Sequence, residues 1–184
     1  MKLMILSDSH IGFGRGTERK NDAMLAFDEA MEEAKNMKVD AVLFAGDMFN
    51  TSMPSSENMI NVMKSISKLF SIDGASPVEF VNKREIKVRG APFIAIHGNH
   101  ERRSKGFKNP VESMEDVGFL IHLHLSGVVI EKNGEKVFVQ GMSYVPERFA
   151  RKLLEKWNPL PRSGMKNILL LHQTELSHLF YNLH

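Results

Sequence analysis

The stretch LMILSDSHIG, residues 3–12, joins a short apolar run to a cluster of polar side chains. Residues 3–6 are all large and apolar, as in a buried strand. Within the next four residues come a carboxylate, Asp8, and an imidazole, His10. Residues i and i+2 of an extended chain point the same way, so these two side chains can share one ligand sphere. The stretch therefore predicts a strand with metal-binding groups at its carboxyl end.

Outward from this stretch, short apolar runs alternate with amphipathic segments, which is the pattern of an α/β protein. The runs at 3–6, 41–45, 92–96 and 167–171 predict strands. The segments 18–37 and 57–70 have apolar residues at helical spacing and predict helices. A third helix is expected over 146–157. Residues 127–141 predict a hairpin that turns at Asn133-Gly134, and 71–90 predict a small inserted hairpin.

Within two residues of its end, each of the four runs is followed by an acid or an imidazole, and an amide follows two of them. These residues are SDSH at 7–10, GD at 46–47, GNH at 98–100 and HQ at 172–173. In open α/β sheets, ligands bind at the carboxyl ends of the strands. A carboxylate can bridge two cations about 3.5–4 Å apart, and Asp47 follows a glycine that permits a sharp turn. We therefore predict a metal site formed by Asp8, His10, Asp47, Asn99 and His172.

The composition restricts both the class of protein and the kind of metal site. The 184 residues, 42% hydrophobic and 25% charged, are typical of one soluble domain. No apolar run approaches the roughly 18 residues of a membrane span, and the first residues do not form a signal peptide, so we expect a cytoplasmic protein. Without cysteine, a metal would be bound through nitrogen and oxygen, which suits manganese, iron or zinc better than copper.

The predicted site suits the hydrolysis of a phosphate ester. Two divalent ions lower the pKa of a bound water from about 15.7 toward about 7, and they contact both the attacking and the leaving oxygen. His100, next to Asn99, would bind the phosphate or protonate the leaving oxygen. The net charge of +2 permits a polyanionic partner without arguing for one.

The segments SDSHIG, AGDMFN, HGNHE and LLHQ occur in an order that resembles the calcineurin-like metallophosphoesterase family. The family pattern is D-x-H, then G-D, then G-N-H-[DE], then a histidine, then G-H-x-H. Within the family, GDMFNTSMPS, EDVGF and QGMSYVP make the chain most similar to the Mre-eleven nucleases of DNA double-strand-break repair. The resemblance implies the layered metallophosphoesterase fold, with central β-sheets flanked by helices.

The resemblance also implies roles for the site residues and partners for the protein. Asp8 and His10 would bind one metal ion, Asn99 and His172 the second, and Asp47 would bridge them. His100 would act on the phosphate. The two ions would be Mn²⁺, the substrate a DNA end, and the partner a Rad-fifty-type ATPase. A homodimer would form through helix 57–70, for which packing in the core is the alternative.

Two features depart from the family pattern. Asn50, a possible substrate contact, stands where the nucleases usually have a histidine that is assigned to the exonuclease step. The final G-H-x-H is absent, and its nearest imitation, Asn182-Leu183-His184, lacks the glycine. We therefore expect residues 1–184 to be a metallophosphoesterase (nuclease) domain that is incomplete at its C-terminus and has weak or no activity. A stand-alone small-molecule phosphodiesterase and an inactive scaffold remain alternatives.

Basic residues near the predicted site are candidate substrate contacts. Arg15 lies in the glycine-rich segment GFGRG, and Arg102 and Arg103 follow HGNHE directly. Each would bind a phosphate of the substrate, and the alternative is a solvated surface turn.

Four further histidines are not assigned to the predicted metal site. His122 and His124 form an H-x-H pair, but this pair precedes the fourth motif instead of following it. We interpret them, with His97 and His178, as structural or surface residues.

Overall fold

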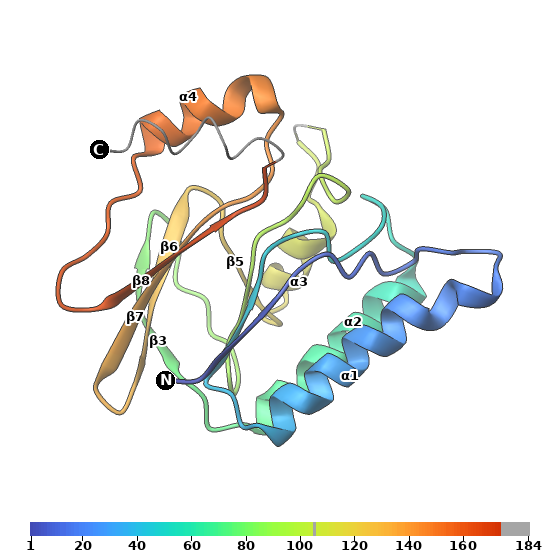
Figure 1. Ribbon diagram of the computed structural model, residues 1–184, viewed down its shortest axis with the longest axis horizontal. Coiled ribbons are helices and arrows are strands. Elements are labelled where there is room, and N and C mark those ends of the chain that lie inside the picture. The colour runs from blue at the N-terminus through green and yellow to red at the C-terminus, as the bar shows by residue number, and fades with distance from the viewer. Residues whose placement is uncertain (105, 174–184) are drawn as a thin grey trace.

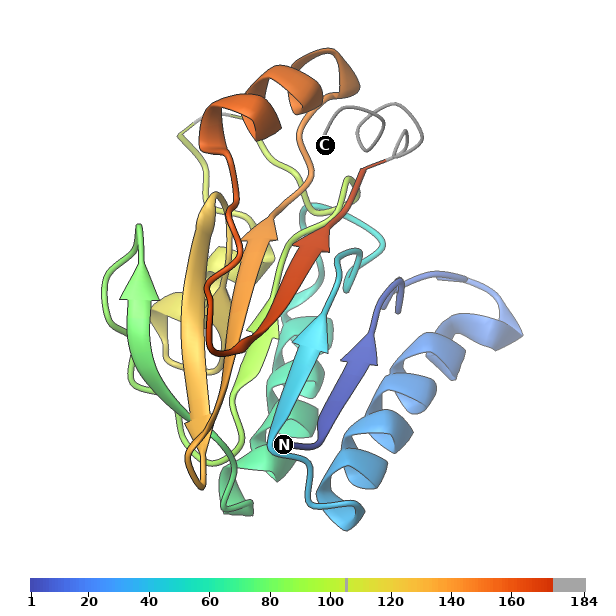
Figure 2. The ribbon, with the colours of Figure 1, turned by 60° about the vertical axis from the view of Figure 1, so that its left-hand side comes forward.

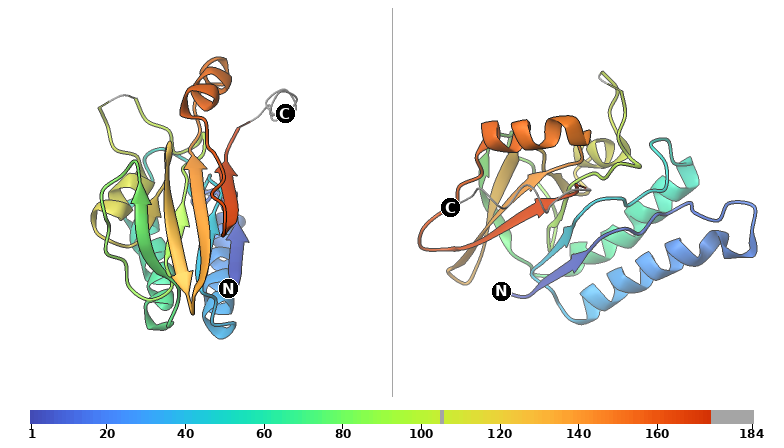
Figure 3. Two further views of the ribbon diagram at one scale, coloured as in Figure 1. Left: turned by 90° about the vertical axis from the view of Figure 1, so that its left-hand side faces the viewer. Right: turned by 45° about the horizontal axis from the view of Figure 1, so that its top comes forward.

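The computed structural model describes residues 1–104 and 106–173, and it places two β-sheets face to face with helices on the outside (Figure 1). The first sheet is parallel throughout, in the order β1-β2-β4-β5. The second has the order β3-β6-β7-β8, with antiparallel pairs except for β7 and β8 (Figure 3, left). The predicted α/β fold of sheets flanked by helices is confirmed.

The strands of the first sheet are short, and most of them are buried. They are β1 (Leu3–Leu6), β2 (Ala41–Phe44), β4 (Phe93–Ala95) and β5 (Ile121–His122). Side chains alternate between the faces of a strand, so Val42 and Phe44 of β2 contact the helices whereas Leu43 contacts the second sheet. The continuous apolar run AVLF is thus explained by burial on both faces.

The second sheet covers the inner face of the first. Its strands are β3 (Ser76–Val81), β6 (Ser126–Lys132), β7 (Glu135–Met142) and β8 (Lys166–Leu171). Val128 and Ile130 of β6 and Val139 of β7 pack against the first sheet in one buried cluster. The hairpin predicted at Asn133-Gly134 is confirmed, and both residues have the positive φ that a tight two-residue turn requires.

Three helices cover the outer face of the first sheet. They are α1 (Asp22–Asn36), α2 (Ser56–Ser67) and α3 (Pro110–Asp116), with 3₁₀ turns η1 (Glu18–Asn21) before α1 and η2 (Lys68–Ser71) after α2. Phe27 of α1 contacts Phe44 and Phe93, with ring centroids 6.2 and 6.3 Å away. Burying each such side chain contributes roughly 1.5–3 kcal/mol to stability. Figure 3, right, shows α1 and α2 side by side.

A fourth helix, α4 (Glu147–Trp157), lies beyond the carboxyl end of β7 (Figure 2). The same view shows β1, β2 and β8 pointing toward one end of the molecule. The carboxyl ends of strands from both sheets therefore meet there. None of the helices in the described residues is long and apolar enough to cross a membrane.

The hairpin predicted within residues 71–90 is wrong. Only residues 76–81 form a strand, which pairs with the edge of β6. After this strand the Lys83 ammonium binds the Glu115 carboxylate at 2.5 Å and the His122 carbonyl. These contacts attach the following chain to α3 and β5, so it does not fold back on β3.

Candidate metal centre

The loops after β1 and β2 stay hydrogen-bonded to each other beyond the ends of the strands. The Asp8 amide donates to the Gly46 carbonyl at 3.0 Å, and the His10 amide donates to the Asp47 carbonyl at 3.0 Å. The Ile11 amide continues the pattern with Met48 at 2.9 Å. This pairing fixes Asp8, His10 and Asp47 next to one another.

The backbone at these three residues differs from the extended chain predicted from the sequence. Asp8, His10 and Asp47 have φ of 55°, 46° and 56°, in the left-handed region that non-glycine residues seldom adopt. Asp8 and His10 still share one site, with 3.8 Å between Asp8 Oδ1 and His10 Nε2, but a turn and not strand alternation brings them together. Such residues cost of order 1–3 kcal/mol each and are concentrated at functional sites.

Two glycines allow the side chains of the centre to approach the backbone. A Cβ atom at Gly98 would overlap Asp47 Oδ1, and one at Gly46 would lie 2.5 Å from His172 Nδ1. Any larger residue at either position would therefore displace Asp47 or His172.

The candidate ligands form two groups that share Asp47. His10, Asp47 and His100 make one group, and Asp8, Asp47 and His172 make the other, with ligand atoms within 4.8 Å of one another in each. Asn99 Oδ1 lies 3.1 Å from His172 Nε2. The structure therefore brings together all five predicted ligands, although His172 comes from the second sheet and the others from the first.

The electrostatics of the centre favour a carboxylate beside a cation. Burial opposes ionisation of Asp47, but hydrogen bonds from His172 and from the His100 amide together hold its pKa below the usual value. The Asp47 carboxylate in turn raises the pKa of His172, against burial, and the Ala45 carbonyl adds to this effect.

The ligand atoms of the centre fit divalent cations. The Ala45 carbonyl, 2.8 Å from His172 Nδ1, can only accept, so Nδ1 carries a proton, and His172 Nε2 lies 3.5 Å from Asp47 Oδ2 and 3.1 Å from Asn99 Oδ1. A hydrogen bond from Nε2 to these oxygens needs a second proton on the ring, and a cation bound between them would take the place of that proton. His10 Nε2 likewise lies 3.8–3.9 Å from two carboxylates, and its buried Nδ1 has no hydrogen-bond partner within residues 1–104 and 106–173. The donor set of nitrogen and oxygen atoms suits manganese, iron or zinc.

The family model of the calcineurin-like phosphoesterases matches residues 1–179. The chain belongs to this family. Membership implies that divalent metal is bound and that the protein is a hydrolase. The resemblance of the sequence motifs to this family is thereby confirmed.

Curated relatives of this phosphoesterase are DNA-repair proteins. It is 29% identical to the double-strand break repair protein mus-23 of Neurospora crassa over 97% of the chain. It is 27% identical to the DNA double-strand break repair protein Mre11 of Methanopyrus kandleri over 94%, and 24% identical to MRE11 of Rattus norvegicus over 96%. The chain spans 28%, 38% and 30% of these relatives.

A solved structure of a protein of unknown function from Aquifex aeolicus overlaps 92% of this chain and 89% of its own, at 14% identity and a TM-score of 0.36.

Glu101 is a residue of the phosphoesterase centre that sequence reasoning missed. Its fully buried carboxylate accepts hydrogen bonds from the Phe49 amide at 2.9 Å and the Gly98 amide at 2.8 Å. Burial raises its pKa to about 7 in spite of these bonds. Glu101 therefore joins the loop that carries Asp47 to the loop that carries Asn99. The signal that could have found it is the acid that ends HGNHE.

His100 borders the phosphoesterase centre and a neighbouring pocket. Its amide donates to Asp47 Oδ1 at 3.0 Å, its Nδ1 lies 3.1 Å from the Asn50 carbonyl, and its ring meets the His10 ring edge to face at 4.7 Å. Asn50 lines the same pocket as His10 and His100. Of the candidate substrate contacts, Asn50 is thus next to the centre.

The three predicted basic contacts do not line the pocket that His10, His100 and Asn50 share. Arg15 lines a separate hollow with Asn58 and other polar residues. Arg102 is exposed, whereas Arg103 donates to the Lys108 carbonyl at 3.2 Å and lies over the Phe107 ring at 5.1 Å. The structure does not bring these arginines into either candidate ligand group.

His97 and His122 are buried neighbours of the centre. His97 Nδ1 lies 3.0 Å from His122 Nε2, which also lies 3.0 Å from Ser143 Oγ. Burial lowers the pKa of His97 to about 3 and that of His122 well below its usual value. Such neutral, hydrogen-bonded imidazoles match the structural interpretation. His178 and the segment 182–184 lie outside the described residues.

Proposed function

We propose that the protein hydrolyses phosphodiester bonds with two divalent metal ions and that its substrate is a DNA end in double-strand-break repair. The observation that carries this proposal is the position of Asp47, which belongs to both groups of candidate ligands. The family supports the hydrolytic reaction, and the names of the relatives support the DNA substrate.

We assign Asp8, His10 and Asp47 to one ion, and Asp47, Asn99 and His172 to the other. Asp8 also lies in the group of Asp47 and His172, and we place it with His10 because of the sequence resemblance. The distances of 3.8 Å between Asp8 and His10 and 3.1 Å between Asn99 and His172 support this division. When bound, the ions supply a hydroxide near neutral pH and neutralise the phosphate. Mn²⁺ is the ion we propose, on the basis of the sequence resemblance.

His100 exchanges the proton of the reaction. The Asn50 carbonyl can only accept a hydrogen bond, so the proton on this side of the ring belongs to His100 Nδ1. Nε2 is then the atom that faces the substrate, and it would donate to a phosphate oxygen or protonate the leaving oxygen when the ring carries a second proton, as the imidazolium. The backbone bond to Asp47 keeps His100 at the edge of the centre.

Two partners are part of the proposal. A Rad-fifty-type ATPase would assemble with the protein, as the resemblance to Mre-eleven nucleases implies. A homodimer would form through α2, where Ile60 is 47% exposed and Met59 and Met63 are only partly buried.

The proposed function is tested by Mn²⁺-dependent cleavage of single-stranded and duplex DNA ends, beside a small nucleotide phosphodiester. Asp47→Asn should lower the rate by more than about 100-fold, because loss of a direct ligand exceeds the loss of an outer one. Asp73→Asn, which changes a carboxylate that is 100% exposed, should leave the rate unchanged.

Hydrolysis that survives both a chelator and Asp47→Asn would contradict the metal mechanism. Turnover confined to the small phosphodiester would contradict the DNA substrate and favour the small-molecule alternative.

A further inference from the structure

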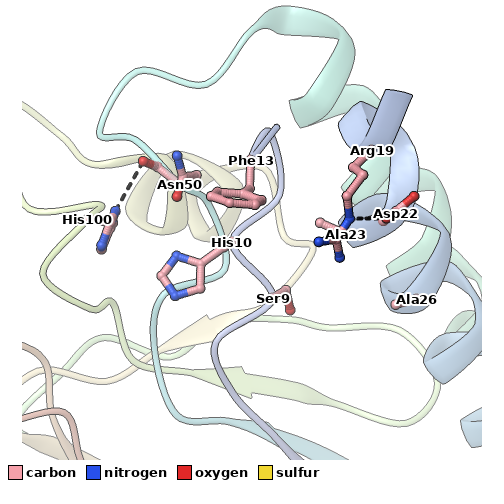
Figure 4. A pocket seen from close by; sticks show the side chains of 9 residues that line it. All are labelled: Ser9, His10, Phe13, Arg19, Asp22, Ala23, Ala26, Asn50 and His100. Carbon is pink, nitrogen blue, oxygen red and sulfur yellow. Dashed lines mark hydrogen bonds and ion pairs between the residues drawn. The ribbon is translucent and has the colours of Figure 1, made fainter. Parts of the chain in front are cut away.

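A pocket of about 550 Å³ opens directly beside the candidate metal centre (Figure 4). His10 and His100, which belong to one group of candidate ligands, line it on one side. Figure 4 shows Arg19 of η1, and Asp22 and Ala23 at the start of α1, on the other side. The pocket and the centre thus share two side chains, and one bound molecule can occupy both.

The pocket offers an aromatic face next to the site of reaction. Phe13 is 56% exposed, and Figure 4 shows its ring above the His10 imidazole. A hydrogen bond of 2.9 Å from the Phe13 amide to the His10 carbonyl holds this turn. Ala23 and Ala26 have small side chains that leave the opposite wall open. An exposed ring in an open, mainly apolar pocket favours a planar ligand that can stack on it.

The charges around the pocket favour a neutral ligand over a second phosphate. Among the described residues, the lining holds one guanidinium, that of Arg19, which is paired with Asp22 at 3.0 Å between Nε and Oδ2. This pair presents both hydrogen-bond donors and acceptors at the rim without an excess of positive charge. A nucleobase has the same combination of a flat face and an edge of donors and acceptors.

We propose that this pocket binds the nucleobase next to the phosphate that is cleaved, and that the base stacks on Phe13. The proposal rests on the proposed function, because it takes the phosphate to lie at the metal centre. The volume of the pocket is within the range of about 300–1,000 Å³ that is usual for small-ligand pockets. A base can enter only when it is unstacked, so the pocket selects an unpaired nucleotide at the DNA end over one in a duplex.

The experiment compares the binding of deoxyadenosine 5′-monophosphate and 2-deoxyribose 5-phosphate by calorimetry in the presence of Mn²⁺. Stacking of one base should make the nucleotide bind about fivefold tighter or more. Phe13→Ala should remove this difference, and Phe13→Tyr should keep it. Phe149→Ala, which removes a ring of similar exposure (51%) from α4, should have no effect. Phe13 is exposed, so its variants should retain the wild-type melting temperature.

Equal binding of the two ligands to the wild type, including no measurable binding of either, would overturn the proposal. So would a preference for the nucleotide that persists in Phe13→Ala. A second measurement uses an oligonucleotide with an abasic terminal residue, which should have a raised KM in the wild type and an unchanged KM in Phe13→Ala. If no diester is cleaved, the proposed function fails, whereas the binding comparison still decides the base pocket.

Discussion

At the scale of single residues, the backbone around the centre is held by a buried acid. Glu101 accepts hydrogen bonds from the Phe49 and Gly98 amides with its two different carboxylate oxygens. A glutamine in its place would direct an NH₂ group at one of these amides. The centre therefore depends on a side chain that is not itself a candidate ligand.

Glu101→Gln should lower the free energy of unfolding by about 1–3 kcal/mol, because one buried amide loses its acceptor. Urea denaturation in the presence of a chelator measures this change without a contribution from metal. Glu155→Gln, at a carboxylate that is 63% exposed, is the matched control and should change stability by less than about 0.5 kcal/mol. Equal stability of the two variants would contradict the role of Glu101.

The buried pair His97 and His122 gives the metal-free protein a specific dependence on pH. In the folded protein the pKa of each histidine lies below the unfolded value of about 6.5. At pH values between the folded and the unfolded pKa, the unfolded chain therefore binds more protons than the folded protein. Their contribution to stability is complete above pH 6.5 and is lost as the pH falls toward the folded pKa.

Removing one imidazole should make this dependence shallower. We expect the free energy of unfolding of the wild type to fall between pH 6.5 and pH 4.5 by up to about 1.4 kcal/mol per pH unit more than that of His122→Gln. Urea titrations across this range compare the slopes and do not depend on the absolute stability of the variant. Parallel slopes would contradict the neutral state of His122.

Most of the candidate site could be predicted from the sequence because each ligand follows an apolar run. Asp8, Asp47 and His172 are found in this way without knowledge of the fold. Glu101 was missed because its partners are backbone amides, and every residue except proline has one, so the sequence does not indicate which amides it binds. The left-handed backbone at His10 was missed because, in a sequence, glycine is the residue that indicates this conformation.

At the scale of secondary structure, the sheets meet at a glycine near the centre. A Cβ atom at Gly141 of β7 would lie 2.6 Å from Leu123 Cβ and 2.7 Å from Ile96 Cγ2. Both neighbours are fully buried in the cluster between the sheets. The sheets can approach this closely only because position 141 has no side chain.

Gly141→Ala should destabilise the protein by about 1–3 kcal/mol, which is typical of an overpacked core. Thermal or urea unfolding measures the change. Lys136→Ala, on the exposed side of β7, is the control and should be nearly neutral. A neutral Gly141→Ala would show that the sheets separate at little cost.

The elements that could be predicted show either a continuous apolar run or a helical period. The strands within 3–6, 41–45, 92–96 and 167–171 show the first, and the helices α1 and α2 show the second. The strand β5 has two residues and α3 has seven, so neither is long enough to show a pattern of apolar residues in the sequence. The pairing of β3 with β6 depends on contacts distant in sequence, which explains the wrong hairpin over 71–90.

At the scale of the whole molecule, the centre requires both sheets. Asp8, Asp47 and Asn99 follow strands of the first sheet, whereas His172 follows β8 of the second. The sequence shows that strand ends carry ligands, but it does not show that two sheets face each other. Packing of the apolar cluster between them is what brings His172 within 3.5 Å of Asp47.

The proposed function depends on two divalent ions that share Asp47. Anomalous diffraction at the manganese edge, from crystals grown with Mn²⁺, shows where these ions bind. We expect two peaks, one between Asp47 and His10 and the other between Asp47 and His172, and the loss of both in Asp47→Asn. Manganese bound only elsewhere, or peaks that persist unchanged in Asp47→Asn, would contradict the proposed function.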